Sequence, residues 1–98
     1  MKIQKLMKQA QEMQSRLEED LGKMVIESSA GGGMVAVKMN GKKQLLSVAI
    51  DPEVLNPDDA DMVADLVLAA VNDASRRVDE AVQSTMGSLG AGLGGLLG

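Results

Sequence analysis

The sequence predicts an α+β fold of the order α-β-β-β-α, with a three-stranded antiparallel sheet and two long helices. In residues 34–50, two runs of alternating apolar residues flank Asn40-Gly41, the dipeptide most typical of a tight β-hairpin. Residues 3–21 and 57–86 instead carry apolar residues at spacings of three and four, the period of a helix with one packed face. With 98 residues, the chain has room for one domain.

The first predicted helix has one continuous apolar stripe and ends before Gly22, a residue type typical of the position after a helix C-terminus. We interpret the stripe as a packing face, because the acids at 18–20 would be repelled by an anionic membrane surface. The stripe consists of Ile3, Leu6, Ala10, Met13 and Leu17.

The predicted sheet begins with a strand at residues 24–30, followed by Gly31-Gly32-Gly33. We interpret the three glycines as a turn, because no Gly-Lys-Ser/Thr follows them as in a phosphate-binding loop. In the hairpin, a two-residue loop would pair Val37 with Gln44. One face would then carry Val35, Val37, Met39, Leu46, Val48 and Ile50, and the other Met34, Ala36, Leu45 and Ala49.

The second helix has a clear predicted start, with Asn56 at the N-cap and Pro57 at the first helical position. Acids cluster just after it, and they are better explained by the positive end of the helix dipole than by a metal site. About 30 residues make a helix of roughly 45 Å, about twice the length of the strands, so its apolar stripe overhangs the sheet.

A second copy of the chain is the simplest cover for this overhang and for the second apolar face of the hairpin. We therefore expect a homodimer. Its predicted interface consists of Met34, Ala36, Leu45, Ala49, Leu66, Ala70, Ala74 and Val78.

Residues 87–98 differ in composition from the predicted domain at residues 1–86. Six of these twelve residues are Gly, so the segment is predicted to be a disordered Gly/Leu-rich tail.

Composition argues against enzyme chemistry. The chain has no His, Cys or Tyr, and no spacing of its acids suggests a paired-carboxylate site. We expect no catalytic residue, no metal, no cofactor and no small-molecule substrate. No secretory signal or membrane-spanning run is evident, so we expect a cytoplasmic protein without a membrane partner.

Charge is distributed unevenly, although the formal net charge is −4. Residues 1–17 carry four basic residues and one acid, whereas residues 51–80 carry nine acids and two arginines. The basic residues are candidates for contacts with DNA phosphates; they are Lys2, Lys5, Lys8, Arg16, Arg76 and Arg77. The alternative is a solvated surface with intrahelical pairs such as Glu12–Arg16 and Asp73–Arg77.

Four segments together resemble the YbaB/EbfC family of bacterial nucleoid-associated proteins, in its order and spacing. They are LMKQAQEMQ (residues 6–14), GGMVAVKMNGK (32–42), VAIDPEVL (48–55) and LVLAAVNDASRRVDE (66–80). The resemblance implies an intertwined homodimer with projecting helices that binds double-stranded DNA in the nucleoid and alters DNA compaction and gene expression. It also implies that the DNA contacts lie on the projecting helical parts. The alternative function is a protein-interaction module that holds a partner on a Met-rich helical surface.

Overall fold

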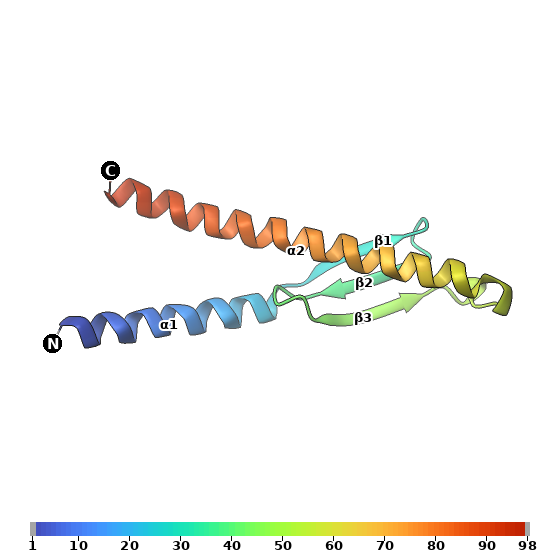
Figure 1. Cartoon of the computed structure of the whole chain (residues 1–98), viewed down its shortest axis with the longest axis horizontal. Helices are drawn as coiled ribbons and strands as arrows, with labels where there is room; N and C mark the ends of the chain where they lie inside the picture. The colour runs from blue at the N-terminus through green and yellow to red at the C-terminus, as the bar shows by residue number, and fades with distance from the viewer. Residues whose placement is uncertain (1, 98) are drawn as a thin grey trace.

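A computed structural model of the chain shows two helices joined by a three-stranded sheet (Figure 1). The model describes the backbone of residues 2–97 and the side chains of residues 2–87. Helix α1 spans Lys2–Lys23, strands β1, β2 and β3 span Ile26–Ala30, Val35–Met39 and Leu45–Ile50, and helix α2 spans Ala60–Leu97. Short 3-10 turns at Pro52–Val54 (η1) and Pro57–Asp59 (η2) join β3 to α2. The predicted order α-β-β-β-α is confirmed.

The two helices project from the same end of the sheet. The sheet is antiparallel in the order β1-β2-β3, and α2 packs on β1 and β2. Helix α2 continues beyond the sheet, α1 leaves the sheet in the same direction, and both ends of the chain lie there (Figure 1). The result is an elongated molecule of 67 × 26 × 15 Å.

A small core lies where α2 crosses the sheet. Val35, Val37 and Met39 of β2 are buried against Ala70, Ala74 and Val78 of α2. The two alanines, both 0% exposed, let the helix backbone approach the sheet closely, so that valine side chains fill the space between them. Full burial of a valine contributes roughly 1.5–3 kcal/mol.

The β2–β3 connection differs from the prediction. It is a five-residue loop at residues 40–44 and not a two-residue turn. The Asn40 side chain is buried, and its Oδ1 accepts hydrogen bonds from the backbone N–H groups of Lys42 and Gln44, at 2.9 and 3.0 Å. Because this amide organises a wider loop, the positive φ falls on Lys43, at 63°, instead of on the Asn-Gly pair.

The pairing register shifts accordingly. Val37 pairs with Val48 instead of Gln44. This shift of four residues is even, so Val37 and Val48 still share a face as predicted. Leu45 is the exception: it pairs with Met39 across an irregularity that leaves Leu46 unmatched, so it shares the face of Met39 and not that of Ala36.

The glycine turn is confirmed. Gly31, Gly32 and Gly33 have φ angles of 65°, 68° and 94°, which other residues rarely adopt. A β-carbon at Gly31 would also lie 2.9 Å from the Leu66 side chain of α2. The absence of a side chain at this glycine therefore lets the β1–β2 turn pack closely against α2.

The ends of α2 also differ from the prediction. Asn56 precedes Pro57 as expected, but its Nδ2 donates to the Glu53 carbonyl, and the chain makes a 3-10 turn before α2 begins at Ala60. The helix continues past the predicted end near Met86 to Leu97. It does so despite its glycines, each of which costs roughly 1 kcal/mol relative to alanine in a helix. The side chains of residues 88–98 lie outside the described residues, and the disorder of the tail stays a prediction.

Overpacking of the core should destabilise the chain. An Ala74→Leu substitution would force three extra carbon atoms between α2 and β2, so we expect a loss of about 2 kcal/mol in the free energy of unfolding. Since the chain has no aromatic residue, urea unfolding should be followed by circular dichroism. Ala69→Leu, on the exposed side of α2, is the matched control and should leave stability nearly unchanged. Equal stability of the two variants would contradict this account of the core.

Candidate nucleic-acid interface

Helix α1 has two opposed faces. At about 100° of rotation per residue, the apolar residues gather on one side and the basic residues on the other. None of its residues is buried. Ile3, Leu6, Met7 and Met13 of the apolar side are 59–69% exposed, so one chain leaves most of this side open to solvent and covers only its C-terminal part, at Leu17, partially.

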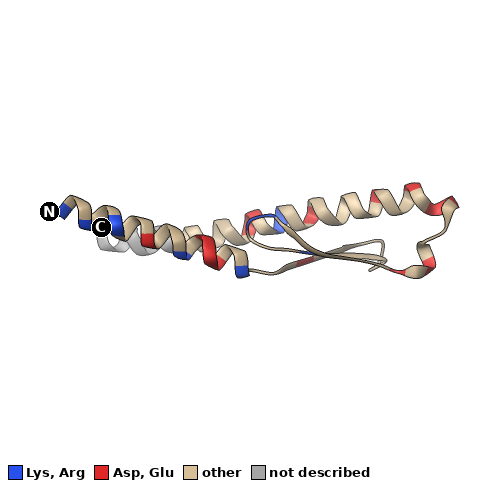
Figure 2. Cartoon of the chain, turned by 90° about the horizontal axis from the view of Figure 1, so that it is seen from below, with Lys and Arg blue, Asp and Glu red and all other residues tan. Residues whose placement is uncertain are grey.

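The basic face of α1, defined as Lys2, Lys5, Lys8 and Arg16, is exposed along the helix. Figure 2 shows the basic residues spread along α1, whereas acids predominate on α2. Within the described part of the chain, no ion pair involves any of these four residues, and the predicted Glu12–Arg16 pair is not formed. Their charges are therefore available to an external anion.

Arg76 and Arg77 are in a different situation, because Asp73 engages both. Its Oδ1 lies 2.8 Å from Nη2 of Arg76, and its Oδ2 lies 2.7 Å from Nε of Arg77. Arg76 also pairs with Glu80, one turn further along the helix. The predicted Asp73–Arg77 pair is thus confirmed, and it uses part of the hydrogen-bonding capacity that a phosphate would need.

The same carboxylate ties α2 to the sheet. The buried hydroxyl of Ser28 on β1 donates to Asp73 Oδ2 at 2.6 Å. This hydrogen bond, together with those from Arg76 and Arg77, holds the pKa of the Asp73 carboxyl well below its usual range. Asp73 and Glu80 in turn raise the pKa of Arg76. The cluster is a charged contact between helix and sheet.

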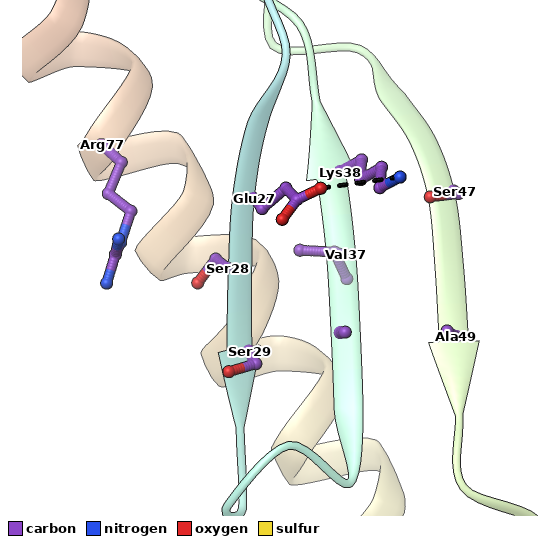
Figure 3. A pocket seen from close by; sticks show the side chains of 9 residues that line it. Glu27, Ser28, Ser29, Val37, Lys38, Ser47, Ala49 and Arg77 are labelled. Atoms are coloured by element: carbon purple, nitrogen blue, oxygen red, sulfur yellow. Dashed lines mark ion pairs between the residues drawn. The ribbon is translucent and has the colours of Figure 1, made fainter.

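The predicted phosphate contacts therefore lie on separate elements. The basic face belongs to a projecting helix, whereas Arg77 lies beside β1, where α2 crosses the sheet (Figures 1 and 3). Near the two arginines, Asp73, Asp79 and Glu80 offset their positive charge. The projecting part of α2 beyond Glu80 contains no charged residue.

Four further lysines were not among the predicted phosphate contacts. Lys23, Lys38 and Lys43 form ion pairs with Glu19, Glu27 and Asp79, at 3.6, 3.6 and 2.8 Å. Lys42, on the exposed β2–β3 loop, has no ion-pair partner among the described residues. The sequence signal that could have identified Lys42 is the pair of adjacent lysines directly after Asn40-Gly41.

The residues of the predicted dimer interface divide into three groups. Ala70, Ala74 and Val78 are at most 1% exposed, because they pack against the chain's own sheet. Leu66 is half-buried beside Gly31. Met34, Ala36, Leu45 and Ala49 keep exposed surface, with Leu45 on the face of Met39.

The face of the sheet opposite α2 carries a shallow hollow of about 280 Å³ (Figure 3). Small side chains such as Ala36, Ser47 and Ala49 line it, beside the Glu27–Lys38 ion pair. No group of three potential metal ligands occurs among the described residues. The hollow has no arrangement that suggests catalysis.

The family model described as the YbaB/EbfC DNA-binding family matches residues 1–93. The chain belongs to this family. A nucleoid-associated protein of Koribacter versatilis is 49% identical over 92 residues, which cover 94% of this chain and 91% of the relative. A nucleoid-associated protein of Acetivibrio thermocellus is 46% identical over 99 residues, covering 98% and 88%.

A solved structure supports the same assignment. The crystal structure of an uncharacterized protein from Helicobacter pylori matches with a TM-score of 0.76 and 28% identity, over 89% of this chain and 91% of that one. YbaB/EbfC membership thus agrees with the fold, and the family is one of nucleoid-associated DNA-binding proteins. In the described part of the chain, no helix is both long and apolar enough to span a membrane.

The Asp73 cluster predicts a pH dependence of stability. Because the folded-state pKa of Asp73 is lowered, the cluster stabilises the fold above the unfolded-state pKa of about 4, and this contribution is lost as the pH falls below it. We expect Asp73→Asn to be less stable than the wild type at pH 7, with the difference shrinking toward pH 2. Urea unfolding at several pH values measures this, and Asp65→Asn, an exposed acid of α2, is the control. A difference that is constant with pH would show that the carboxylate charge is not responsible.

Proposed function

We propose that the chain binds double-stranded DNA through phosphate contacts from the basic face of α1. The observation that carries the proposal is that Lys2, Lys5, Lys8 and Arg16 lie exposed on one projecting helix, without ion-pair partners among the described residues. Such contacts are independent of sequence, and they weaken steeply with salt. Arg76 and Arg77 take second place in this proposal, because Asp73 and Glu80 already engage them.

Dimerisation belongs to the same proposal. Helices in proteins gain most of their stability from the packing of an apolar face and not from intrinsic helix propensity. Helix α1 has 22 residues, and none of them is buried by the rest of its own chain. A second chain that covers the apolar side would stabilise α1 and leave the basic face free for DNA. An intertwined homodimer meets this requirement.

In the cell, this activity would place the protein in the nucleoid. The relatives from Koribacter and Acetivibrio are named nucleoid-associated proteins, which supports this location. Two basic helices held at a set separation by a dimer would contact the duplex at two places. We propose that this alters DNA conformation and compaction, and through them gene expression. The family assignment supports no enzymatic activity, and no observation specifically favours the protein-interaction alternative.

Neutralising the basic face should weaken DNA binding. For Lys5→Gln/Lys8→Gln we expect lower affinity for a labelled duplex, and a plot of log K against log salt that is shallower by about 2 per chain, since each lost phosphate contact removes about 0.9. Fluorescence anisotropy at several salt concentrations measures both quantities. Lys23→Gln/Lys38→Gln is the matched control, with the same charge change on residues that already have ion-pair partners. If both variants lose equal affinity, the effect is one of net charge and the assignment to the basic face fails.

The dimer is tested by light scattering. We expect a mass of twice the 10.2 kDa chain at micromolar concentration. Leu6→Asp/Met13→Asp, on the apolar side of α1, should produce monomers, because carboxylates would replace apolar contacts between chains. Gln9→Asp/Gln11→Asp, on exposed positions outside the apolar stripe, should remain dimeric. A wild-type protein that is monomeric under these conditions would rule out the dimer.

A further inference from the structure

The contact between α1 and the rest of the chain is small, and we call it the joint. Close to the end of the helix, the backbone N–H of Gly41 in the β2–β3 loop donates a hydrogen bond of 2.8 Å to the carbonyl of Leu21. The last carbonyls of a helix lack partners within the helix, so this bond satisfies one of them from outside. The same carbonyl accepts a longer bond, of 3.3 Å, from the N–H of Met24.

Gly41 fits this joint because it has no side chain. A β-carbon there would lie 2.8 Å from the Leu21 carbonyl oxygen, 2.9 Å from Leu21 Cδ2 and 3.0 Å from Leu21 Cα. Two of these three atoms are backbone, so no change of side-chain rotamer relieves the contact. The φ angle of Gly41 lies outside the left-handed range, and its backbone would accept alanine. Space alone therefore requires glycine at this position.

The loop that presents Gly41 is held firmly. Asn40 is 3% exposed, and its side chain holds Lys42 and Gln44 through the hydrogen bonds described above. The backbone N–H of Asn40 also donates to the Gln44 carbonyl at 3.0 Å, and its own carbonyl accepts from the N–H of Lys43 at 3.0 Å. Lys43 in turn is tied to α2 through Asp79. A side chain added at Gly41 should therefore displace α1 more readily than it displaces the loop.

We infer that Gly41 is a positioning residue for DNA binding: its close contact with Leu21 sets the direction in which α1 projects. This inference rests on the proposed function of the basic face. Lys5 and Lys8 lie about 13–16 residues from the joint, or roughly 20–24 Å along the helix. A small rotation at Leu21 is amplified over that length, so Gly41 acts on the phosphate contacts without touching DNA.

The test compares Gly41→Ala with Gly22→Ala. Gly22 adjoins the same joint, but a β-carbon there meets nothing within 4 Å. The chain has no cysteine, so Gln11→Cys on α1 and Ser84→Cys on α2 allow site-specific spin labelling. Pulsed electron resonance then gives the distance between the helices, with labelled chains diluted in unlabelled protein to isolate pairs within one chain. Light scattering and circular dichroism verify that each variant keeps its assembly and fold.

We expect Gly41→Ala to shift the distance between the labels and to weaken duplex binding by roughly tenfold, a loss of about 1.4 kcal/mol. Gly41→Val should shift the distance further, whereas Gly22→Ala should change neither quantity. An unchanged distance in Gly41→Ala, or a shifted distance with unchanged affinity, would overturn the inference. If the wild-type chain fails to bind DNA, the proposed function fails, while the distance measurement still decides whether Gly41 orients α1. Should Gly41→Ala unfold, Leu21→Ala tests the same contact from the other side, because it removes the Cδ2 atom beside Gly41 and should also change the distance and the affinity.

Discussion

The packing of α2 on β2 is the contact on which the rest of the structure depends. Ala70 and Ala74 bring the helix close to the sheet, and Val35, Val37 and Val78 fill the remaining space. No aromatic residue contributes, so close approach and not side-chain bulk produces this core. One helix on a three-stranded sheet buries little surface, which is why much of the apolar surface of a single chain stays exposed.

Much of this exposed apolar surface lies along α1. The helix carries an apolar stripe and a basic face on opposite sides, and the described part of the chain fully buries no residue of either. The two faces call for different chemistry, because the stripe needs another apolar surface and the basic face needs anions. The proposed dimer, bound to DNA, would supply both, and the assignment to the YbaB/EbfC DNA-binding family agrees with the second.

Charge separation reconciles an acidic chain with DNA binding. The net charge is −4, yet the acids are concentrated in the segment that connects the sheet to α2 and along α2 itself. Several of them are paired locally, as Asp73 is with Arg76 and Arg77 and Asp79 is with Lys43. The end of α1 that carries Lys2, Lys5 and Lys8 projects away from this acidic region, so the field at the basic face is dominated by its own residues.

The order of elements and the existence of the basic face were predictable from the sequence, because both follow from local periodicity. Apolar spacing predicted the helices and the hairpin, and Lys2, Lys5 and Lys8 share a helix face whatever the surrounding fold. The glycine turn was equally local, since three adjacent glycines favour positive φ angles.

Only the tertiary structure decided what the long-range contacts are. Asn40-Gly41 was recognised as a turn, but the buried Asn40 amide changed its length, and Gly41 is required by Leu21, twenty residues away. The Asp73–Arg77 pair follows from spacing along the helix, but only the fold shows that Ser28 of β1 donates to the same carboxylate across the helix–sheet contact. The sequence by itself thus determined the elements, the charge pattern of α1 and the Asp73–Arg77 pair, whereas the register, the joint and the Ser28–Asp73 contact depend on which distant residues pack together.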